Sequence, residues 1–475
     1  MTGVPAAEKQ MDAIRDYASF RDPSGFMFWK AGEIYRCIHA SYADVFKAAD
    51  TCGLFKAAVA AGLLLPFEIC ERMSVPIHLG DHSTVMRPRQ INAISYPYEW
   101  SFTALKEAAL ATLRLQLLAL EHGFLLKDAS AFNIQFVEGA PQFIDHLSFD
   151  PIAHHNAWPA YGQFCRHFLG PLLLMSYVDL SFGSILQKYI DGPPLDLVSR
   201  LLPRRTELSP SIQIHLHMHA RMSKSYADAD KRVGGGRTLS ARGFQSIANS
   251  LLNLIERLEP KDQFTEWGNY YADTNYSDQA LSAKKDLLRT MVQSIEPHTV
   301  WDLGGNNGEF SHALTDLAGQ IICMDIDPRA VDQNYIRCRK DKISNVLPLI
   351  ADVTNPPPAV GFANRERPAL LDRNKPDLVI ALALIHHLAI SNNLPLSYIA
   401  DFLANQTPAL IIEFVPKSDS QVRRLLANRP DIFPNYSREG FEAAFGDRFA
   451  ITRANAIPGT DRTLFVMHRR SGTDT

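Results

Sequence analysis

Apolar and polar residues in the N-terminal part of the chain follow two patterns. Residues 1–150 contain short strand-like runs and then one long helix, predicted over 102–122. One face of this helix carries an apolar stripe at helical spacing, formed by Leu105, Ala108, Ala109, Leu113, Leu117 and Leu120. Residues 151–258 are rich in leucine and aromatic side chains. We therefore expect a mixed α+β region over 1–150 and a mostly helical region over 151–258.

The C-terminal part, from about Trp267 onward, alternates strand-like and helical segments. Apolar runs predict strands over 299–303, 321–324, 346–350, 378–384 and 409–414. Amphipathic segments predict helices over 308–317, 328–339, 396–404 and 418–427. This alternation indicates a parallel sheet with helices on both faces.

The last two predicted strands break this alternation. They lie at 449–453 and 463–468 and are joined by a turn that contains Pro458-Gly459. They are typical of a closing hairpin with one antiparallel strand. We predict two domains, 1–258 and 259–475, and place the sheet and its terminal hairpin in the second.

Length, charge and cysteine content narrow the class of protein. A chain of 475 residues exceeds the usual size of one domain. The net charge of −3 gives no general attraction to nucleic acid or anionic membranes. The six cysteines form no CxxC pair, and neither a signal peptide nor a membrane-spanning apolar run is visible. We expect a cytoplasmic protein that acts on a small molecule, and its oligomeric state stays open.

The sharpest motif is a glycine-rich turn between the first strand and the first helix of the predicted sheet. Residues 300–308 read Val-Trp-Asp-Leu-Gly-Gly-Asn-Asn-Gly, with Gly304, Asn306 and Gly308 in the turn. Glycines allow a tight turn and close approach of a ligand, and the helix N-terminus offers free N–H groups. A turn of this kind alone also fits a dinucleotide site.

Three aspartates after consecutive strands narrow the choice of ligand. Asp302 precedes the turn, where a carboxylate attracts an ammonium group and repels a pyrophosphate. Asp325 ends the second strand, where it can accept hydrogen bonds from both ribose hydroxyls. Asp352 follows the third strand and can accept from an adenine amino group. Ammonium, ribose and adenine in this order describe S-adenosylmethionine, and the neighbouring Ile326 and Val353 complete the predicted cofactor site.

These residues resemble the motifs of class I S-adenosylmethionine-dependent methyltransferases, over about 200 residues up to the terminal hairpin. The family loop reads acidic-x-Gly-x-Gly-x-Gly, and here Asn306 stands in place of the middle glycine. The resemblance implies an α/β, Rossmann-like methyltransferase sheet and S-adenosylmethionine as cofactor. A Rossmann domain that binds NAD, or no ligand, is the alternative.

Two further residues are candidates on the acceptor side, because ligands bind at the carboxyl ends of the strands in such sheets. His386 follows the fourth strand and could act as a general base. It could equally line the cofactor pocket. Glu413 ends the fifth strand and could orient a polar acceptor or serve as a buried structural carboxylate.

Two other groups of residues have less specific patterns. A metal site at His215, His217 and His219 is not expected, since no carboxylate or cysteine stands nearby and a helix would scatter these side chains. The aromatic residues before the first strand could form a lid over the cofactor or simply pack against the sheet. They are Trp267, Tyr270, Tyr271 and Tyr276.

A segment of the N-terminal half resembles the catalytic loop of kinase-like phosphotransferases. Asp128 and Asn133 follow the long helix, and Asp145 ends an apolar run twelve residues further on. The resemblance implies a base at Asp128 and magnesium ligands at Asn133 and Asp145. However, no glycine-rich nucleotide loop is visible, and His-Leu follows Asp145 in place of Phe-Gly. We expect a divergent kinase-like fold with a substrate-binding or scaffold role.

The whole arrangement resembles bacterial two-part methyltransferases that are loosely associated with host-specific nodulation proteins. We expect methyl transfer from S-adenosylmethionine to an unidentified acceptor, which the N-terminal half helps to bind. The alternatives are a regulatory protein that binds the cofactor without turnover, and a phosphotransferase fused to a methyltransferase.

Overall fold

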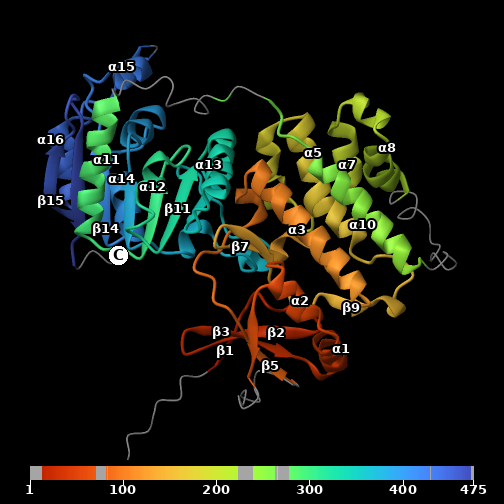
Figure 1. Ribbon diagram of the computed structural model, residues 1–475. Coiled ribbons are helices and arrows are strands. Elements are labelled where there is room, and N and C mark those ends of the chain that lie inside the picture. Colours follow the sequence, from red (N-terminus) through yellow and green to blue (C-terminus); the bar gives the residue numbers. More distant parts are fainter. Residues whose placement is uncertain are drawn as a thin grey trace, which may run out of the picture.

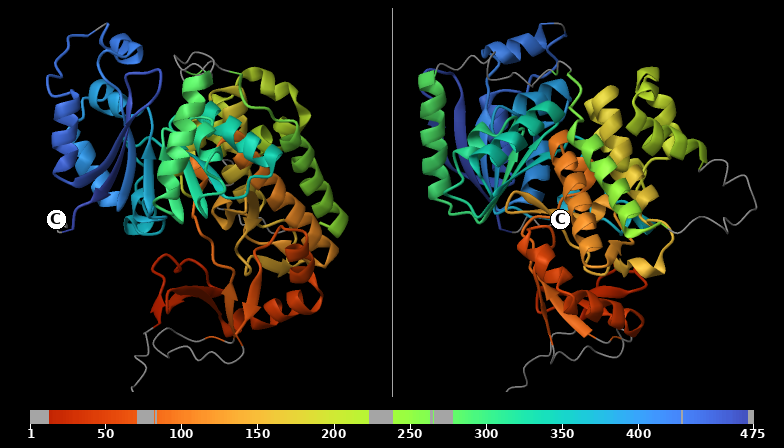
Figure 2. Two further views of the ribbon diagram at one scale, coloured as in Figure 1. Left: turned by 60° about the vertical axis from the view of Figure 1, so that its left-hand side comes forward. Right: turned by 45° about the vertical axis from the view of Figure 1, so that its right-hand side comes forward.

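The computed structural model describes residues 13–70, 82, 84–222, 239–262, 265, 278–427 and 429–471. Three parts follow one another along the chain: a small N-terminal sheet, a helical region and a large sheet covered by helices (Figures 1 and 2). The helical region lies between the other two in sequence and contacts both of them.

The N-terminal sheet has five antiparallel strands in the order β1-β2-β3-β5-β4. The strands are β1 (Ile14–Arg15), β2 (Gly25–Lys30), β3 (Glu33–Ile38), β4 (Phe67–Ile69) and β5 (Thr84–Pro88). Alternating residues of β2 place Phe26 and Phe28 on one face, where they pack with Cys37 and Val85. Two helices, α1 (Ala40–Thr51) and α2 (Leu54–Ala60), follow β3.

The long helix predicted over 102–122 is confirmed as α3 (Phe102–Glu121). Its N-cap is Ser101, whose hydroxyl accepts a hydrogen bond from the backbone N–H of Ala104. The predicted apolar stripe is buried, with Leu117 partly so, and packs against α10 (Ala241–Glu256).

Region 151–258 is mostly helical, as predicted, over the residues that the structure describes. Its remaining α-helices are α4 (Tyr161–Phe164), α5 (Gly170–Tyr177), α6 (Ile185–Lys188), α7 (Leu195–Leu201) and α8 (Pro210–Ile212). Two strand pairs precede it: β6 (Phe124–Leu126) with β9 (Phe149–Pro151), and β7 (Ile134–Val137) with β8 (Ala140–Phe143).

The large sheet has seven strands in the order β12-β11-β10-β13-β14-β16-β15. Five strands are parallel: β10 (Thr299–Leu303), β11 (Gln320–Asp325), β12 (Val346–Ile350), β13 (Leu378–Ala381) and β14 (Ala409–Phe414). The last two, β15 (Phe449–Ala456) and β16 (Thr463–Arg469), are antiparallel. The strands lie where the sequence pattern predicts them, except that β13 is shorter and ends at Ala381.

Helices cover both faces of this sheet, because alternate residues of each buried strand point to opposite sides. On one face, Val300 and Ile321 pack against Leu288 of α11 (Asp278–Gln293). On the other, Trp301 and Ile322 belong to the core that includes Ile399. The remaining helices are α12 (Glu309–His312), α13 (Pro328–Asp341), α14 (Leu396–Gln406), α15 (Ser420–Leu426) and α16 (Arg438–Gly446).

The helix predicted over 308–317 is longer than the one observed, because α12 ends at His312. The following residues form turns, in which the Thr315 hydroxyl donates a hydrogen bond to the carbonyl of His312. Thr side chains that bond to nearby backbone groups compete with regular helix.

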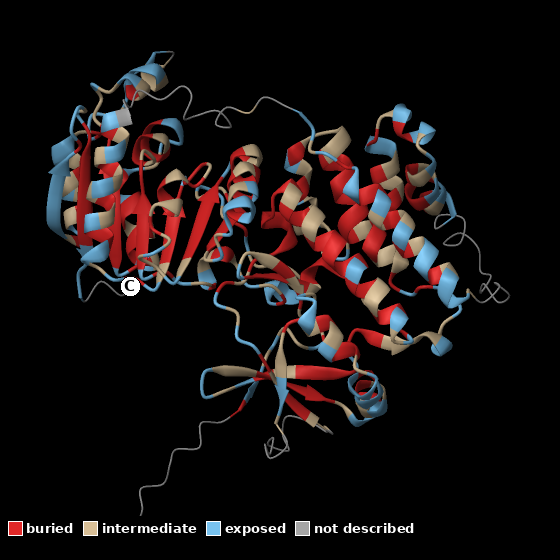
Figure 3. Cartoon of the chain, in the orientation of Figure 1, coloured by how far each residue is buried: buried red, intermediate tan, exposed pale blue. Residues whose placement is uncertain are grey.

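The two halves of the chain share one hydrophobic core, and Figure 3 shows buried residues in both of them. Helix α13 packs on α3, where Asp332 accepts from the Thr103 backbone N–H at 2.7 Å and Tyr335 donates to Glu107 at 2.7 Å. Glu99 and Arg373 form a salt bridge with both side chains buried. The division at residue 258 stays a prediction.

Among the helices that the structure describes, none is both long enough and apolar enough to cross a bilayer.

We predict that the Glu99–Arg373 pair holds the two halves together. Glu99→Ala leaves the Arg373 guanidinium buried without its carboxylate, and such changes cost about 3–5 kcal/mol of unfolding free energy. Urea denaturation measures this loss. The control is Asp341→Ala, which removes a half-exposed pair with Arg337 at 3.8 Å and should cost less than about 1 kcal/mol. Equal, small losses in the two variants would contradict a bridging role for Glu99.

Candidate functional site

The candidate site lies where the order of the parallel strands reverses, between β10 and β13. In open α/β sheets, ligands bind outside the carboxyl ends of the strands at this point. A cleft of about 420 Å³ opens there. Its walls come from the ends of β10, β11, β12 and β13, from α11 and from the segment after β13.

The glycine-rich turn forms the floor of this cleft. Backbone N–H groups of Gly304 and Gly305 donate to the Met324 carbonyl at 2.9 and 3.0 Å, which ties the turn to β11. Asn306 has a φ of 50°, a left-handed conformation that asparagine adopts more readily than most residues. This explains why asparagine can stand where the methyltransferase motif that the sequence resembles has glycine.

Gly305 is required for another reason, which is space. A Cβ atom at this position would lie 2.4 Å from Cys323 Sγ and 2.9 Å from Asp302 Oδ2. The turn is therefore packed directly against the carboxylate that it follows.

Asp302 lies at the end of β10 and is 2% exposed. Its Oδ2 accepts a hydrogen bond from Ser311 Oγ at 2.7 Å. Burial raises the pKa of Asp302 to about 6, while the Ser311 hydroxyl and the charge of Lys284 oppose this rise. A ligand cation beside Asp302 would further favour the ionised form.

Asp325, at the end of β11, is held in one orientation by two backbone groups. Its Oδ2 accepts from Asn306 N–H at 2.8 Å and its Oδ1 from Asp327 N–H at 2.9 Å. Each carboxylate oxygen has a second lone pair for another donor. Burial raises the pKa of Asp325 to about 6, against the two backbone hydrogen bonds. The adjacent Ile326 is 55% exposed and lines the cleft.

Asp352 and Val353 follow β12 on the cleft wall. Asp352 Oδ1 accepts from the backbone N–H and the hydroxyl of Thr354, at 2.8 and 2.7 Å. The predicted cofactor residues thus lie around one cleft, apart from Gly308. Gly308 is the N-cap of α12, and a Cβ atom there would lie 2.5 Å from Asn334 Oδ1.

The histidine that lines the cleft is His387, not the predicted His386. His386 is 1% exposed, and its Nδ1 has no hydrogen-bond partner among the described residues. The π-helical turn His387–Ser391 begins here, and the centroids of the two imidazole rings are 4.1 Å apart. Burial, with the charge of Arg462, lowers the pKa of His387 to about 4.

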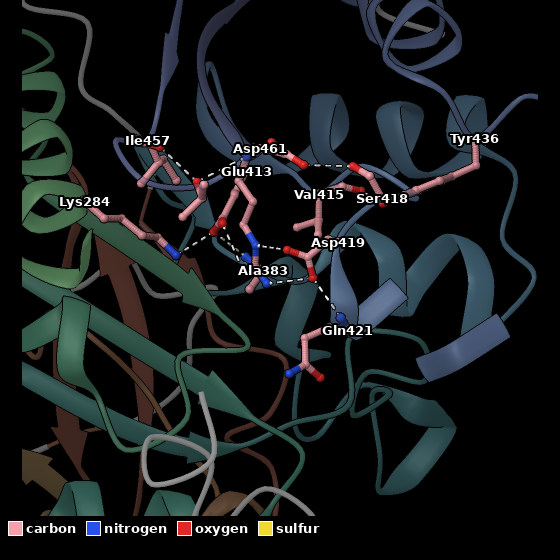
Figure 4. Close-up of polar contacts among 12 residues, drawn as sticks. Lys284, Ala383, Glu413, Val415, Ser418, Asp419, Gln421, Tyr436, Ile457 and Asp461 are labelled. Atoms are coloured by element: carbon pink, nitrogen blue, oxygen red, sulfur yellow. Dashed lines mark hydrogen bonds and ion pairs between the residues drawn. The ribbon is translucent and has the colours of Figure 1, made fainter. Parts of the chain in front are cut away.

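Glu413 lies behind the cleft wall and is fully buried. Its Oε2 accepts from Lys284 Nζ at 2.5 Å and from Ala383 N–H at 2.9 Å, and its Oε1 faces Arg462 Nη1 at 3.3 Å (Figure 4). The sequence allowed two roles for Glu413, a buried structural carboxylate or a group that orients the acceptor. These contacts correspond to the structural carboxylate.

Lys284 is a cleft residue that sequence reasoning missed. Its side chain is 1% exposed and its Nζ lies 4.5 Å from the centroid of the Phe310 ring. Burial lowers the pKa of Lys284, opposed by Glu413. Lys284 lies at helical spacing between Leu281 and Leu288 on α11, so a lysine within an apolar stripe was the available signal.

The residues of the predicted kinase-like site, Asp128, Asn133 and Asp145, also lie close together. However, the guanidinium group of Arg36 lies beside Asp145, where a magnesium ion would bind. Asp145 Oδ1 lies 2.5 Å from Nη1 of Arg36, a β3 residue that also pairs with Asp22. Asp128 accepts from Ser130 N–H at 2.9 Å, and both Asn133 and the charge of Asp145 influence its pKa, which burial raises.

The three histidines of the helical region do not converge on a common point. His215 bonds to Tyr161 and Ser250, and His217 bonds to Ser199 and Thr206. No group of three or more possible metal ligands occurs within the described ranges. The aromatic residues proposed as a lid, Trp267, Tyr270, Tyr271 and Tyr276, lie outside those ranges.

Comparisons with known proteins give one relative over the full length. Nodulation protein NoeA of Rhizobium meliloti (strain 1021) is 36% identical over 456 residues, which cover 95% of each chain. No family model matches the chain. The solved N-methyltransferase NodS from Bradyrhizobium japonicum WM9 is 12% identical, with a TM-score of 0.31 over 41% of this chain and 98% of that one. A SAM-dependent methyltransferase from Aquifex aeolicus is 15% identical, with a TM-score of 0.32 over 44% and 100%.

We predict that Gly305→Ala strains the turn at the floor of the cleft. The new methyl group would overlap Cys323 and Asp302, and overpacking of this kind costs about 1–3 kcal/mol. Thermal or urea denaturation measures the effect. Gly446→Ala is the matched control, since a Cβ atom there meets nothing within 4 Å, and alanine at a helix end should be neutral or mildly stabilising. A Gly305→Ala variant as stable as the wild type would contradict tight packing at this position.

Proposed function

The chain belongs to the family of nodulation protein NoeA, and we propose that it transfers methyl groups from S-adenosylmethionine to a small acceptor. One observation carries this proposal. Carboxylates at the ends of three consecutive strands, Asp302, Asp325 and Asp352, surround a single cleft at the switch point of the sheet. When bound, S-adenosylmethionine supplies an activated methyl group on a cationic sulfur.

The cleft residues fit the parts of this cofactor in the order of the strands. Asp302, buried and near Lys284 and Ser311, is suited to an ammonium group. Asp325, with one lone pair free on each oxygen, is suited to two ribose hydroxyls. Asp352 and Val353 are suited to the adenine edge and face. A pyrophosphate, as in NAD, would meet the negative charge of Asp302.

On the acceptor side, we infer that His387 is the proton-accepting group. His387 lines the cleft, and burial keeps its imidazole neutral near pH 7, so a ring nitrogen can accept a hydrogen bond from an acceptor hydroxyl or amine and take its proton as methylation makes that group acidic. Ser391 and Asn392 line the same cleft and offer hydrogen-bonding groups. These groups favour a polar metabolite as acceptor, and nothing in the charge balance favours nucleic acid.

For the N-terminal half, we infer a divergent kinase-like fold that helps to bind the acceptor. The antiparallel sheet, the long α3 and the grouping of Asp128, Asn133 and Asp145 support the resemblance. However, the ion pair between Asp145 and Arg36 occupies the carboxylate that magnesium would need. The residues therefore do not fit a magnesium site, and this favours binding over phosphotransfer.

The name of the relative connects it with nodulation. We propose that the acceptor of this chain is a metabolite of the same process.

Calorimetric titration of the whole chain tests the proposal against its alternatives. We expect binding of S-adenosylmethionine and S-adenosylhomocysteine, and none of NAD or of ATP with magnesium. Incubation of metabolite extracts with methyl-labelled cofactor then separates an enzyme from a regulatory protein that only binds the cofactor. Binding of NAD without S-adenosylmethionine would overturn the proposal.

We predict that cofactor affinity depends on the charge of Asp302. Asp302→Asn keeps the shape but removes the partner of the ammonium group, at a cost of about 1–3 kcal/mol, or several-fold to a hundredfold in Kd. Asp325→Asn should weaken S-adenosylmethionine and S-adenosylhomocysteine alike, because both ligands contain the ribose. Asp316→Asn, at an exposed pair with Arg289, is the control and should change nothing.

The pH dependence follows from the same two carboxylates. The pKa of Asp302 and of Asp325 is about 6, and the cofactor needs both groups ionised. Affinity should therefore be highest near pH 7 and fall as pH drops through 6. Calorimetry between pH 5 and 8 checks this, and the fall should be shallower in Asp302→Asn. An affinity that rises toward low pH would contradict the assignment.

We predict that His387→Gln lowers turnover by about 10²–10⁴-fold with little change in cofactor affinity, as expected for loss of a general base. His386→Gln is the matched control, since that ring lies behind the wall of the cleft. The measurement is methyl transfer to the acceptor found with labelled cofactor, after circular dichroism has shown that both variants fold. Loss of turnover in His386→Gln but not in His387→Gln would instead identify His386 as the general base, as the sequence suggests.

A further inference from the structure

The chain makes an unusual turn directly after β13. Ala383 has a φ of 49°, in the left-handed region that residues other than glycine rarely adopt. Ala383 and both its neighbours, Leu382 and Leu384, line the cleft. The conformation of this one residue therefore shapes the wall that leads to His387.

Glu413 supplies the group that holds this turn. The ladder between β13 and β14 ends with Ala381 opposite Ile412. Glu413 is the next residue on β14, and its Oε2 accepts the backbone N–H of Ala383 at 2.9 Å. A side-chain carboxylate thus takes the place of a backbone carbonyl where the strand has left the sheet.

The carboxylate is itself held by two cationic side chains, so that its position is well defined. Lys284 of α11 and Arg462, in the turn before β16, both face it. Arg462 is fixed in turn by Asp419, through bonds of 2.8 and 3.1 Å. Asp419 also caps α15 by accepting from Gln421 N–H. These contacts are drawn in Figure 4.

We propose that Glu413 is a positioning residue, which acts on the cleft through Ala383 rather than on the acceptor. Its charge network holds the Ala383 turn in the left-handed conformation and so keeps the wall formed by residues 382–384 in place for the cofactor. The expected effect of Glu413 on cofactor binding rests on the proposed function, whereas its effect on the backbone conformation of Ala383 does not.

The test uses a variant that can fold but lacks the Glu413 carboxylate, which accepts the hydrogen bond of the Ala383 N–H. In Lys284→Met/Glu413→Leu, an ion pair is replaced by apolar side chains of similar volume, which is often neutral for stability, and Arg462 keeps its pair with Asp419. Lys284→Met alone is the reference, because it removes one charge but keeps Glu413. The measurements are amide hydrogen exchange of peptides covering residues 382–388 and the Kd for S-adenosylhomocysteine.

We expect faster exchange at Ala383 in the double variant than in Lys284→Met, and a Kd raised about tenfold, the order expected for loss of a held, strained residue. Adding Ala383→Gly should return the Kd to the Lys284→Met value, since glycine adopts this conformation without strain. Adding Ala31→Gly instead should not, although Ala31 has a similar φ of 53° and lies in the distant turn between β2 and β3.

Equal exchange in Lys284→Met and in the double variant would overturn the inference. So would rescue by Ala31→Gly as large as rescue by Ala383→Gly, which would indicate a general gain in stability. If the wild type does not bind S-adenosylhomocysteine, the proposed function fails, and the exchange measurement alone decides the role of Glu413.

Discussion

A carboxylate buried at the carboxyl end of β14 must be neutralised, and the elements around the cleft place two cationic side chains beside it. Glu413 is fully buried, and a buried charge is tolerated only when it is paired and hydrogen-bonded. Its partners come from both ends of the C-terminal half. Lys284 comes from the helix before the first strand. Arg462 comes from the terminal hairpin, because Thr463 pairs with Phe414 and the turn before it therefore lies beside Glu413.

A second constraint connects the cleft to the N-terminal half. The segment between β12 and β13 begins on the cleft wall with Asp352 and Val353 and then runs onto the N-terminal half. There Glu366 pairs with Arg21 and Arg373 pairs with Glu99. The same segment therefore contacts both the proposed cofactor site and the region proposed to bind the acceptor. This segment therefore connects the cleft physically with the N-terminal half.

The sequence was most informative where the signal is local. Alternating apolar runs placed the strands of the large sheet, and aspartates directly after strands placed Asp302, Asp325 and Asp352 around one cleft. The sequence did not show which of the two adjacent histidines lines the cleft, since His387 begins a π-helical turn and no periodicity predicts such a turn. The pairing of Lys284 and Arg462 with Glu413 depends on the folded sheet, since these residues are far apart in the chain. The contacts between the halves were missed for the same reason.

The central claim is that three strand-end carboxylates bind S-adenosylmethionine. A crystal structure of the chain with S-adenosylhomocysteine tests it most directly. The account predicts the ligand in the cleft at the switch point, with its amino group at Asp302, its ribose hydroxyls on Asp325 and its adenine beside Asp352 and Val353. A ligand bound elsewhere, or bound there with Asp302 and Asp325 out of contact, would contradict it.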